Sequence, residues 1–416
     1  MVDVYRRTIC RMCESNRLKK VMALTATPPG NNFLSKAELD LPEPAYPLEL
    51  YFCQDCYHVQ LGHVVDPRIL YQKDYFYVSG ISSKFVEHLN DYALEMIEHL
   101  RLNSGSLVVD IGSNDGTCLK AFQQAGIDKI LGIDPATKIA QRATEAGIET
   151  IGDFFSCELA KVLRKDYGPA KLITSHNACA HIDNLDDVLR GVQHWLDNDG
   201  VFILEVGYLL DVYENAWFDT IYHEHLDFHT VGPFKKLFER VGMELIGVQR
   251  ISPQGGSIRV MAQKMNGPRV VDHSVQDLIS LEESKGLDKP ETFIKFNQRI
   301  NEVGIQLRAL IQSIKARGET IAAFGAPTKS TTLLAHFGLG KDDLDFILDD
   351  NPLKQGLFSP ATHIPVLATE ELYRYRPDYL LILAWNFAEP IMANNQRYAN
   401  EGGKFIVPMP VPRIID

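Results

Sequence analysis

The four cysteines nearest the N-terminus form two pairs of identical spacing. Cys10 and Cys13 make up the first pair, and Cys53 and Cys56 make up the second. Two such pairs supply four thiolates with the spacing of a tetrahedral zinc site, and four cysteines leave no open coordination position. The pattern therefore predicts a structural zinc ion, with two pairs of redox-active or free thiols as the alternative. The 39 residues between the pairs exceed the usual separation, so the segment 27–47, TPPGNNFLSKAELDLPEPAYP, which is rich in turn formers, is expected to loop out.

A second cluster of reactive side chains lies in the stretch 222–229. It contains a tyrosine, two acids and three histidines: Tyr222, His223, Glu224, His225, Asp227 and His229. A metal site, a solvated loop and general acid/base chemistry are the three interpretations. A metal site is disfavoured because Glu224 would point away from His223 and His225 if they shared one face of a strand. Tyrosine, glutamate and histidine together supply a hydroxyl donor, an orienting carboxylate and a titratable base, which favours acid/base chemistry.

The residues that must position this chemistry begin with the stretch 107–135, LVVDIGSNDGTCLKAFQQAGIDKILGIDP. Its pattern predicts a strand ending at Asp110, a turn containing Gly112 and Asn114, a helix, and a second strand ending at Asp134. The glycines allow close approach of a ligand, and the helix N-terminus presents unsatisfied N–H groups. The acid that ends the second strand is placed to hold two ribose hydroxyls.

The ligand of this turn can be partly identified. A dinucleotide site requires glycine at the positions of Gly112, Asn114 and Thr117, so only one of three glycines is kept. The pattern D-x-G-x-N-x-G instead resembles the first motif of class I S-adenosylmethionine (SAM) methyltransferases, whose ligand carries no phosphate. A turn without a ligand is the remaining alternative. In the methyltransferases, the turn that corresponds to Asp153 and Phe154 lies beside the adenine.

Further candidates lie at predicted strand ends and in one tyrosine-rich stretch. That stretch, 71–79, is interpreted either as aromatic packing at a domain junction or as a lid over the ligand cleft. Side chains that follow strands are of interest because ligands bind at the carboxyl ends of strands in open α/β sheets. The candidates for binding substrate are Tyr75, Tyr77, Ser79, Asn177, His181, Arg259, Lys329 and Asn386. Among them, Lys329 stands at a predicted helix start that suits an anion such as a diphosphate.

The overall composition narrows the class of protein. The chain has 416 residues, which predicts two or three domains. A net charge of −12 argues against a nucleic-acid partner. The sequence shows neither an apolar stretch of about 18 residues, the length needed to span a membrane, nor a signal peptide, so we expect a cytoplasmic protein. A helical pattern over 292–317 is expected to bridge two domains, and a second α/β unit starts near residue 320.

In their order, these motifs resemble the family of SAM-dependent C-methyltransferases of nucleotide-linked deoxysugars, especially its members that methylate C-3. The resemblance spans essentially the full length and rests on both cysteine pairs, VDIGSNDG, GDFF, the turn from Asn177 to His181, YHEH, GGSIR, GAPTKS, THIPV and LAWNFAEPIM. It implies an α/β fold with a class I SAM-methyltransferase Rossmann-like core, an N-terminal zinc-binding lobe and a C-terminal Rossmann-like domain that helps to hold the nucleotide. We place the lobe at 1–75, the core at 76–265, a helical connector at 266–318 and the C-terminal domain at 319–416.

The resemblance also implies roles for Tyr222, Glu224 and His225 at the sugar. Carbon 3 of a 4-keto-6-deoxysugar carries an acidified proton, because the adjacent ketone stabilises the enolate. His225 is expected to remove this proton, Glu224 to orient His225, and Tyr222 to donate to the enolate oxygen. His223 is a departure from the family pattern, because it places a second titratable group beside the expected base. The expected substrate is dTDP-linked and the expected protein a monomer. The alternatives are an NAD-dependent sugar-nucleotide oxidoreductase and a non-catalytic zinc-ribbon scaffold.

Overall fold

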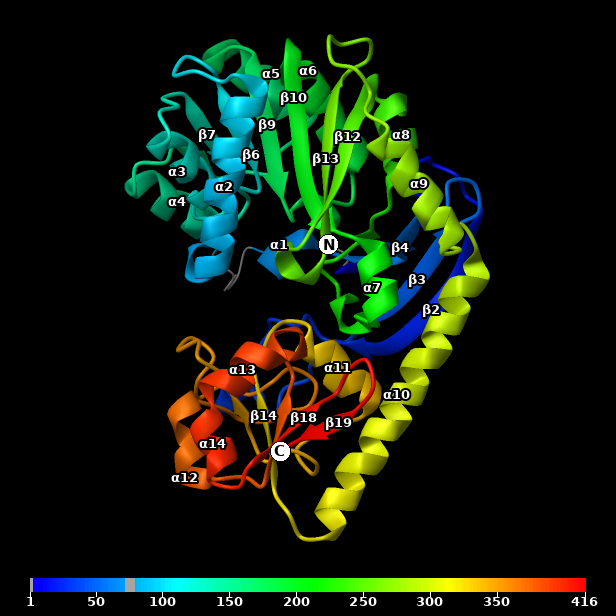
Figure 1. The fold of residues 1–416 in the computed structure, drawn as a ribbon, viewed down its shortest axis with the longest axis vertical. Coiled ribbons are helices and arrows are strands. Elements are labelled where there is room, and N and C mark those ends of the chain that lie inside the picture. Colours follow the sequence, from blue (N-terminus) through cyan, green and yellow to red (C-terminus); the bar gives the residue numbers. More distant parts are fainter. Residues whose placement is uncertain (1–2, 72–78) are drawn as a thin grey trace.

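The computed structural model describes residues 3–71 and 79–416, which form three large sheets and one two-stranded sheet (Figure 1). The central sheet occupies the upper half of Figure 1 and the C-terminal sheet the lower half, with the N-terminal strands beside the junction between them. Of the substrate-binding candidates, Tyr75 and Tyr77 lie outside the described residues. None of the described helices is long and apolar enough to cross a membrane.

The central sheet has seven strands, in the order β12-β13-β10-β9-β6-β7-β8. Six of them run in the same direction, and β13 runs antiparallel between β10 and β12. The strand bounds are β6 Val108–Ile111, β7 Ile130–Ile133, β8 Thr150–Ile151, β9 Ala170–His176, β10 Leu196–Gly207, β12 Met243–Ile251 and β13 Ser257–Lys264. Strands β6 and β7 are buried throughout, as are residues 200–206 of β10, as expected for a sheet that helices cover on both faces. The strand predicted at 201–205 is observed as β10, which is longer and spans Leu196–Gly207. Its register with β9 is irregular between Leu196 and Val201.

Helices connect and cover these strands. They are α2 Ser83–Leu100, α3 Thr117–Gln124, α4 Thr137–Glu145, α5 Cys157–Tyr167, α6 Leu185–Trp195, α7 Leu209–Asn215 and α8 Val231–Arg240. The helix predicted to follow the glycine turn is α3, whose N-cap is Gly116. The carboxyl ends of β6, β7 and β9 therefore meet at one edge of the sheet, above the start of α3.

The N-terminal sheet is built from antiparallel strands in the order β11-β4-β3-β2. Its bounds are β2 Leu18–Thr27, β3 Tyr46–Cys53, β4 Val59–Leu61 and β11 Asp227–Phe228; a separate pair joins β1 Val4–Arg6 to β5 His63–Val65, which α1 Pro67–Tyr71 follows. Within the segment between the cysteine pairs, β2 and β3 pair with each other, and residues 28–45 loop out between them, as expected. One strand, β11, comes from the segment between β10 and β12 of the central sheet, so the central domain contributes a strand to the N-terminal sheet.

The C-terminal sheet has six strands in the order β16-β15-β14-β17-β18-β19, all parallel except β19. The strands are β14 Ile321–Phe324, β15 Ile347–Leu348, β16 Val366–Leu367, β17 Tyr379–Ile382, β18 Lys404–Val407 and β19 Arg413–Ile415; the helices are α11 Ser330–Phe337, α12 Leu372–Tyr375, α13 Ala388–Asn394 and α14 Gln396–Asn400. This is the second α/β unit that the sequence predicts.

A long helix, α10, runs along one side of the molecule and reaches the C-terminal domain (Figure 1). It spans Pro290–Ala316, close to the predicted 292–317, and follows α9 Ser274–Ser284. Pro290 suits its first turn because proline needs no hydrogen-bond acceptor for its nitrogen there. The helix packs against β2 of the N-terminal sheet and against α11. Its buried face includes Phe293, Phe296, Ile300, Val303, Leu307, Ile311 and Ile314, which recur at steps of three and four.

The residues 217–221 join the central domain to the C-terminal domain. Asp219 is fully buried and accepts a hydrogen bond from the indole Nε1 of Trp385 at 2.7 Å. The ammonium group of Lys329 lies 3.6 Å from the same carboxylate and 4.7 Å from the centre of the Trp385 ring. Thr332 of α11 donates to the carbonyl of Ile221 at 3.0 Å. The domains are thus joined by a buried ion pair and hydrogen bonds, which fix their orientation.

We predict that Trp385→Phe weakens this junction. The substitution keeps an aromatic ring but removes the donor to a buried carboxylate, which should cost about 1.5–3 kcal/mol of unfolding free energy. Urea unfolding followed by circular dichroism measures the change. Trp217→Phe is the control, because its ring packs beside Trp385 at 6.0 Å and it lies outside the Asp219 contact. Equal stability of Trp385→Phe and the parent protein would contradict the role given to this bond.

Candidate active site

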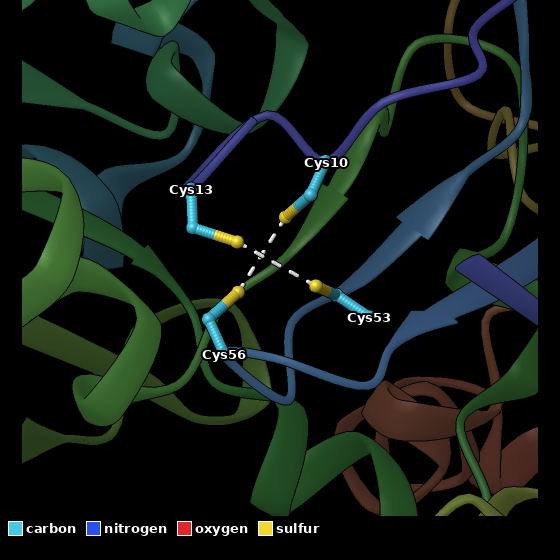
Figure 2. Close-up of side chains that lie close together, drawn as sticks. All are labelled: Cys10, Cys13, Cys53 and Cys56. Carbon is cyan, nitrogen blue, oxygen red and sulfur yellow. Dashed lines mark hydrogen bonds between the residues drawn. The ribbon is translucent and has the colours of Figure 1, made fainter. Parts of the chain in front are cut away.

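The four cysteine sulfurs converge on one point (Figure 2). The Sγ atoms of Cys10 and Cys56 lie 3.4 Å apart and those of Cys13 and Cys53 lie 3.6 Å apart, and all four lie within 4.8 Å of one another. A tetrahedral zinc ion with Zn–S bonds of about 2.3 Å separates its sulfurs by roughly 3.8 Å, so the cluster fits zinc. Three of the four cysteines are buried. Four thiolates close the coordination sphere, and the zinc is therefore structural.

The turn after β6 forms a cradle at the carboxyl edge of the central sheet. Gly112 has φ +75°, and a Cβ at this position would lie 2.4 Å from the Cβ of Ala178 in the turn after β9. Asp110 is buried, its Oδ1 has no hydrogen-bond partner among the described residues, and burial raises its pKa to about 7. An orphaned buried carboxyl oxygen beside a cradle free of side chains fits the methionine part of SAM.

Asp134 is held at the same edge by backbone amides. Its two carboxyl oxygens accept from the amide nitrogens of Asn114 and Ala136, each at 2.8 Å. Burial raises its pKa, and these two hydrogen bonds oppose the shift. The acid is thereby oriented beside the turn, as a group that binds ribose hydroxyls must be. Asp153 and Phe154 follow β8 at the rim, where Phe154 is 39% exposed and available to a flat ring such as adenine.

The backbone of Ser79 lies against the turn that follows β6, and its expected contact with substrate stays a prediction. Its backbone amide donates to Oδ1 of Asn114 at 3.0 Å, and the amide of Gly80 donates to Asp115 at 3.0 Å. The residues that precede α2 therefore cover the glycine turn. The sequence could not show this, because the two contacts join segments 35 positions apart.

Tyr222 and His225 form a hydrogen-bonded pair in the turn before β11. The hydroxyl of Tyr222 lies 2.9 Å from Nε2 of His225, and Nδ1 of His225 lies 2.8 Å from the carbonyl oxygen of Thr220. A carbonyl only accepts, so Nδ1 carries the proton and the Nε2 lone pair accepts from Tyr222. Burial lowers the pKa of His225 to about 4. The histidine is therefore neutral at physiological pH and has one nitrogen able to take a proton.

Two other predicted residues lie beside this pair. The ring of His181, in a short turn after β9, lies 5.1 Å from the ring of His225. Burial lowers the pKa of His181 well below its usual value. Asn177 follows β9 and has a left-handed backbone conformation. Its backbone N–H donates to the backbone carbonyl of Glu205 at 2.7 Å. Strand β9 thus connects the SAM edge to the histidines.

Glu224 was expected to orient His225, and the structure corrects this. Both ring nitrogens of His225 are engaged by Thr220 and Tyr222, while Oε1 of Glu224 accepts from the Asn31 amide at 3.1 Å. Asn31 in turn accepts from Thr328 of the C-terminal domain at 2.8 Å. Burial raises the pKa of Glu224 to about 7. Glu224 and His225 are adjacent in sequence, but their side chains point in different directions, so Glu224 does not contact the His225 ring nitrogens.

His223 also turns away from His225. Its Nε2 donates to the carbonyl oxygen of Tyr46 at 3.1 Å, in the N-terminal sheet. Burial lowers its pKa to about 4. His223 and His225 do not share a strand face, because they lie in a turn. No cluster of metal ligands among the described residues includes either histidine.

Three of the predicted substrate-binding residues are bonded to protein groups. The guanidinium of Arg259 donates to Glu205 at 2.7 Å and to Glu95 at 2.6 Å. Lys329 donates to Asn386 at 2.8 Å, and both belong to the buried junction at Asp219. Burial lowers the pKa of Lys329. In the structure their charged and amide groups join segments of the protein, and direct contact with substrate stays a prediction.

One cluster was missed by the sequence reasoning. His88 and His176 contact the same oxygen of Glu205, at 2.6 and 3.2 Å, and the other oxygen is bound by Arg259. Burial alone would raise the pKa of Glu205, but the charge and hydrogen bond of His176, the hydrogen bond of His88 and the charge of Arg259 hold it well below the usual value. Two histidines and a carboxylate could hold a metal ion, yet Arg259 already neutralises the carboxylate, so the cluster is an ion-pair network.

Comparison with known proteins gives three family models that match successive parts of the chain. A zinc binding domain matches residues 10–71, a methyltransferase domain matches residues 85–248, and a C-methyltransferase C-terminal domain matches residues 252–410. The chain is 36% identical to the C-methyltransferase NovU of Streptomyces niveus over 406 residues, which are 98% of this chain and 96% of that protein.

Solved structures resemble less than half of the chain. The magnesium protoporphyrin IX methyltransferase of Synechocystis with bound SAM is 14% identical, with 43% of this chain and 79% of that chain covered and a TM-score of 0.33. A SAM-dependent methyltransferase of Clostridium acetobutylicum is 12% identical, with 44% and 92% covered and a TM-score of 0.36. Because both TM-scores lie below 0.5, nothing further is drawn from these likenesses.

The sulfur cluster predicts one zinc ion per chain. Purified protein analysed by atomic emission should contain zinc at a molar ratio of about one, because four cysteines fill one tetrahedral site. Cys53→Ser should lower this ratio, whereas Cys157→Ser, which changes a cysteine outside the cluster, should leave it unchanged. Zinc-free protein of normal stability would contradict the assignment.

Asp134→Ala should weaken SAM binding by about ten- to a hundredfold, since a hydrogen bond to a charged group contributes roughly 1.5–3 kcal/mol. Isothermal titration calorimetry measures the affinity. Asp128→Ala is the control, because Asp128 lies in the loop before β7, at the opposite end of that strand. An unchanged SAM affinity of Asp134→Ala would show that the acid does not hold the ribose.

Proposed function

The chain belongs to the C-methyltransferase family, and from this membership we propose that it methylates carbon 3 of a nucleotide-linked 4-keto-6-deoxysugar, with dTDP as the nucleotide. Transfer of a methyl group from SAM to carbon follows from the family and the domain models. The sugar, the carbon position and the roles of individual residues are our proposal. The observation that carries it is the neutral, oriented Tyr222–His225 pair near the carboxyl edge of the central sheet.

The proposed reaction needs a base because a carbon nucleophile must first be made. Nε2 of His225 removes the proton from C-3, next to the ketone, and the electron pair of that C–H bond becomes the enolate. The Tyr222 hydroxyl, released from Nε2 when the substrate enters, donates to the enolate oxygen. A buried position strengthens this stabilisation because little water competes for the developing charge. The Thr220 carbonyl holds the ring of His225 in place, which lowers the entropic part of the barrier.

Bound SAM supplies an electrophilic methyl group, so that the new C–C bond forms as the S–C bond breaks and S-adenosylhomocysteine leaves. The residues that would hold it are Asp110, the turn at Gly112 and Asn114, Asp134, and the rim at Asp153 and Phe154. Asn177 and His181, between this edge and His225, would face the sugar. Glu224, held through Asn31, would form the wall towards the C-terminal domain.

The proposed place of the nucleotide is the carboxyl edge of the C-terminal sheet. Its geometry repeats that of the SAM edge. Gly325 after β14 has φ +87°, and a Cβ there would lie 2.8 Å from the Cβ of Ala384 after β17. Asp349 after β15 accepts from the amides of Ala326 and Asn351, at 2.6 and 2.9 Å. The repeated cradle and oriented acid suit a second nucleoside, which supports a nucleotide-linked substrate.

The function is tested by incubating the protein with deuteromethyl-SAM and a set of nucleotide-linked 4-keto-6-deoxysugars. Mass spectrometry and NMR should show a methyl group on C-3 of at least one sugar, and S-adenosylhomocysteine in equal amount. A C-3 deuterium label should exchange with solvent if proton removal is reversible. A methyl group on oxygen, or on another carbon, would contradict the proposed substrate position while leaving SAM-dependent methylation intact.

We predict that His225→Asn lowers kcat by about 10²–10⁴, the usual contribution of a positioned base, with SAM affinity unchanged. Because burial lowers the pKa of His225 to about 4, it stays unprotonated and active well below the ordinary histidine value near ~6.5. The acidic limb that it contributes to the kcat/KM profile should therefore fall near pH 4. Exposed His273→Asn is the control. Near-normal turnover of His225→Asn, with loss in Tyr222→Phe, would give the base role to Tyr222.

A further inference from the structure

The two zinc-binding turns carry two buried side chains that reach the catalytic turn. Arg11 lies between Cys10 and Cys13, and His58 lies two residues after Cys56. Nε2 of His58 lies 2.7 Å from Oδ1 of Asp227, and both side chains are fully buried. The Arg11 guanidinium lies 3.9 Å from the same oxygen. Asp227 lies two residues after His225. It is contacted by Arg11 from the first zinc-binding turn and by His58 from the second.

Arg11 also holds the backbone next to His225. Its Nη1 donates to the carbonyl of Leu226 at 3.3 Å and to that of Leu61 at 2.9 Å, and its Nε donates to Asp183 at 2.8 Å. An arginine fork with all these contacts fixes several groups at once, because its nitrogens are coplanar. Arg11 therefore ties the residue that follows His225 to β4 and to the loop before α6.

Backbone pairing completes the connection. Strands β4 and β11 pair with Asp227 opposite Gln60 and Phe228 opposite Val59, and the amide of Leu61 donates to the carbonyl of Leu226 at 2.8 Å. The side chain of Gln60 accepts from the backbone amide of Arg11 at 2.9 Å. The segment that follows His225 is therefore β11, the edge strand of the N-terminal sheet.

We propose that Arg11 and His58 are positioning residues, through which the zinc centre sets the place of the His225 turn. The zinc ion joins the two turns, because each contributes two of its four ligands, and so fixes Arg11 relative to His58. The Arg11 turn is closed on itself by short-range backbone bonds such as Glu14 N to Cys10 O at 3.0 Å, and the zinc ion adds a link to the second turn beyond the hydrogen bonds of Arg11. The inference rests on the proposed role of His225, and it goes beyond stabilisation of the N-terminal lobe.

The same region offers a matched comparison. Arg17 lies four residues after Cys13. Its side chain is 61% exposed and pairs with Asp55 on the outer surface. Arg11 has no exposed side-chain surface. Replacing each by lysine keeps the positive charge and removes the planar fork. If the N-terminal lobe served stability alone, any loss of turnover in either variant should be explained by loss of folded protein.

The experiment compares Arg11→Lys with Arg17→Lys in the full-length protein. Both should retain one zinc per chain. Arg11→Lys should lose about 10- to 100-fold in kcat, as expected when a proton acceptor is displaced rather than removed, with SAM affinity within about twofold of the parent. Its acidic limb should also rise from near pH 4 towards the ordinary histidine value, because a loosened turn admits water. Arg17→Lys should match the parent in every measurement.

Hydrogen exchange gives a reading that does not depend on activity. Amides of residues 220–228 should exchange faster in Arg11→Lys and in the zinc-depleted parent, while those of 107–133, at the SAM edge, should not change. If no sugar substrate is turned over by the parent, the proposed function fails, but this comparison still decides whether zinc positions the turn.

Asp227→Asn tests the same connection from the other side and lies far from the cysteines in sequence. It should also speed exchange at 220–228 with zinc retained. Two outcomes would overturn the inference. One is unchanged exchange and kcat in both Arg11→Lys and Asp227→Asn. The other is loss of zinc with faster exchange throughout the N-terminal sheet in both variants, which would indicate a role in lobe stability alone.

Discussion

The pairing of β11 with β4 is the contact on which the candidate active site depends. It holds one end of the segment 217–228 on the N-terminal sheet. The other end is anchored to the C-terminal domain, through Asp219 with Trp385 and through Ile221 with Thr332. Tyr222 and His225 lie between these two anchors. Their distance from the SAM edge is therefore fixed by three parts of the chain rather than by the central domain alone, and a base that acts on a weakly acidic carbon requires such fixed positioning.

Burial sets the protonation states around this segment. It lowers the pKa of His223 and His225 to about 4, and raises the pKa of Glu224 and Asp110 to about 7. Each shift disfavours the charged form, as expected where water is scarce. The histidines remain neutral at physiological pH, whereas the two carboxyl groups are divided between neutral and ionised forms there. An enolate formed in such surroundings interacts more strongly with a nearby hydroxyl than it would in water.

The features that the sequence predicted well depend on local spacing. The zinc cluster follows from two short cysteine pairs, the SAM turn from a glycine between two strands, and α10 from a repeat of apolar residues. Partners distant in sequence were not predictable. Glu224 meets Asn31 across 193 positions, and Asp219 meets Trp385 across 166. Lys329 was read as a diphosphate ligand from its place at a helix start, but nothing local reveals that a buried aspartate lies opposite.

The two α/β units show how far one local geometry can be reused. Gly112 and Gly325 both have positive φ and face an alanine after a neighbouring strand, and Asp134 and Asp349 each accept from two backbone amides. The edges differ in what surrounds them. At the first edge, Asp110 keeps a buried oxygen without a protein partner. At the second, the nearby lysine is already paired with Asp219 and Asn386. The shared backbone therefore makes two similar turns, while the side chains around each turn set its charge, since fold alone does not determine function.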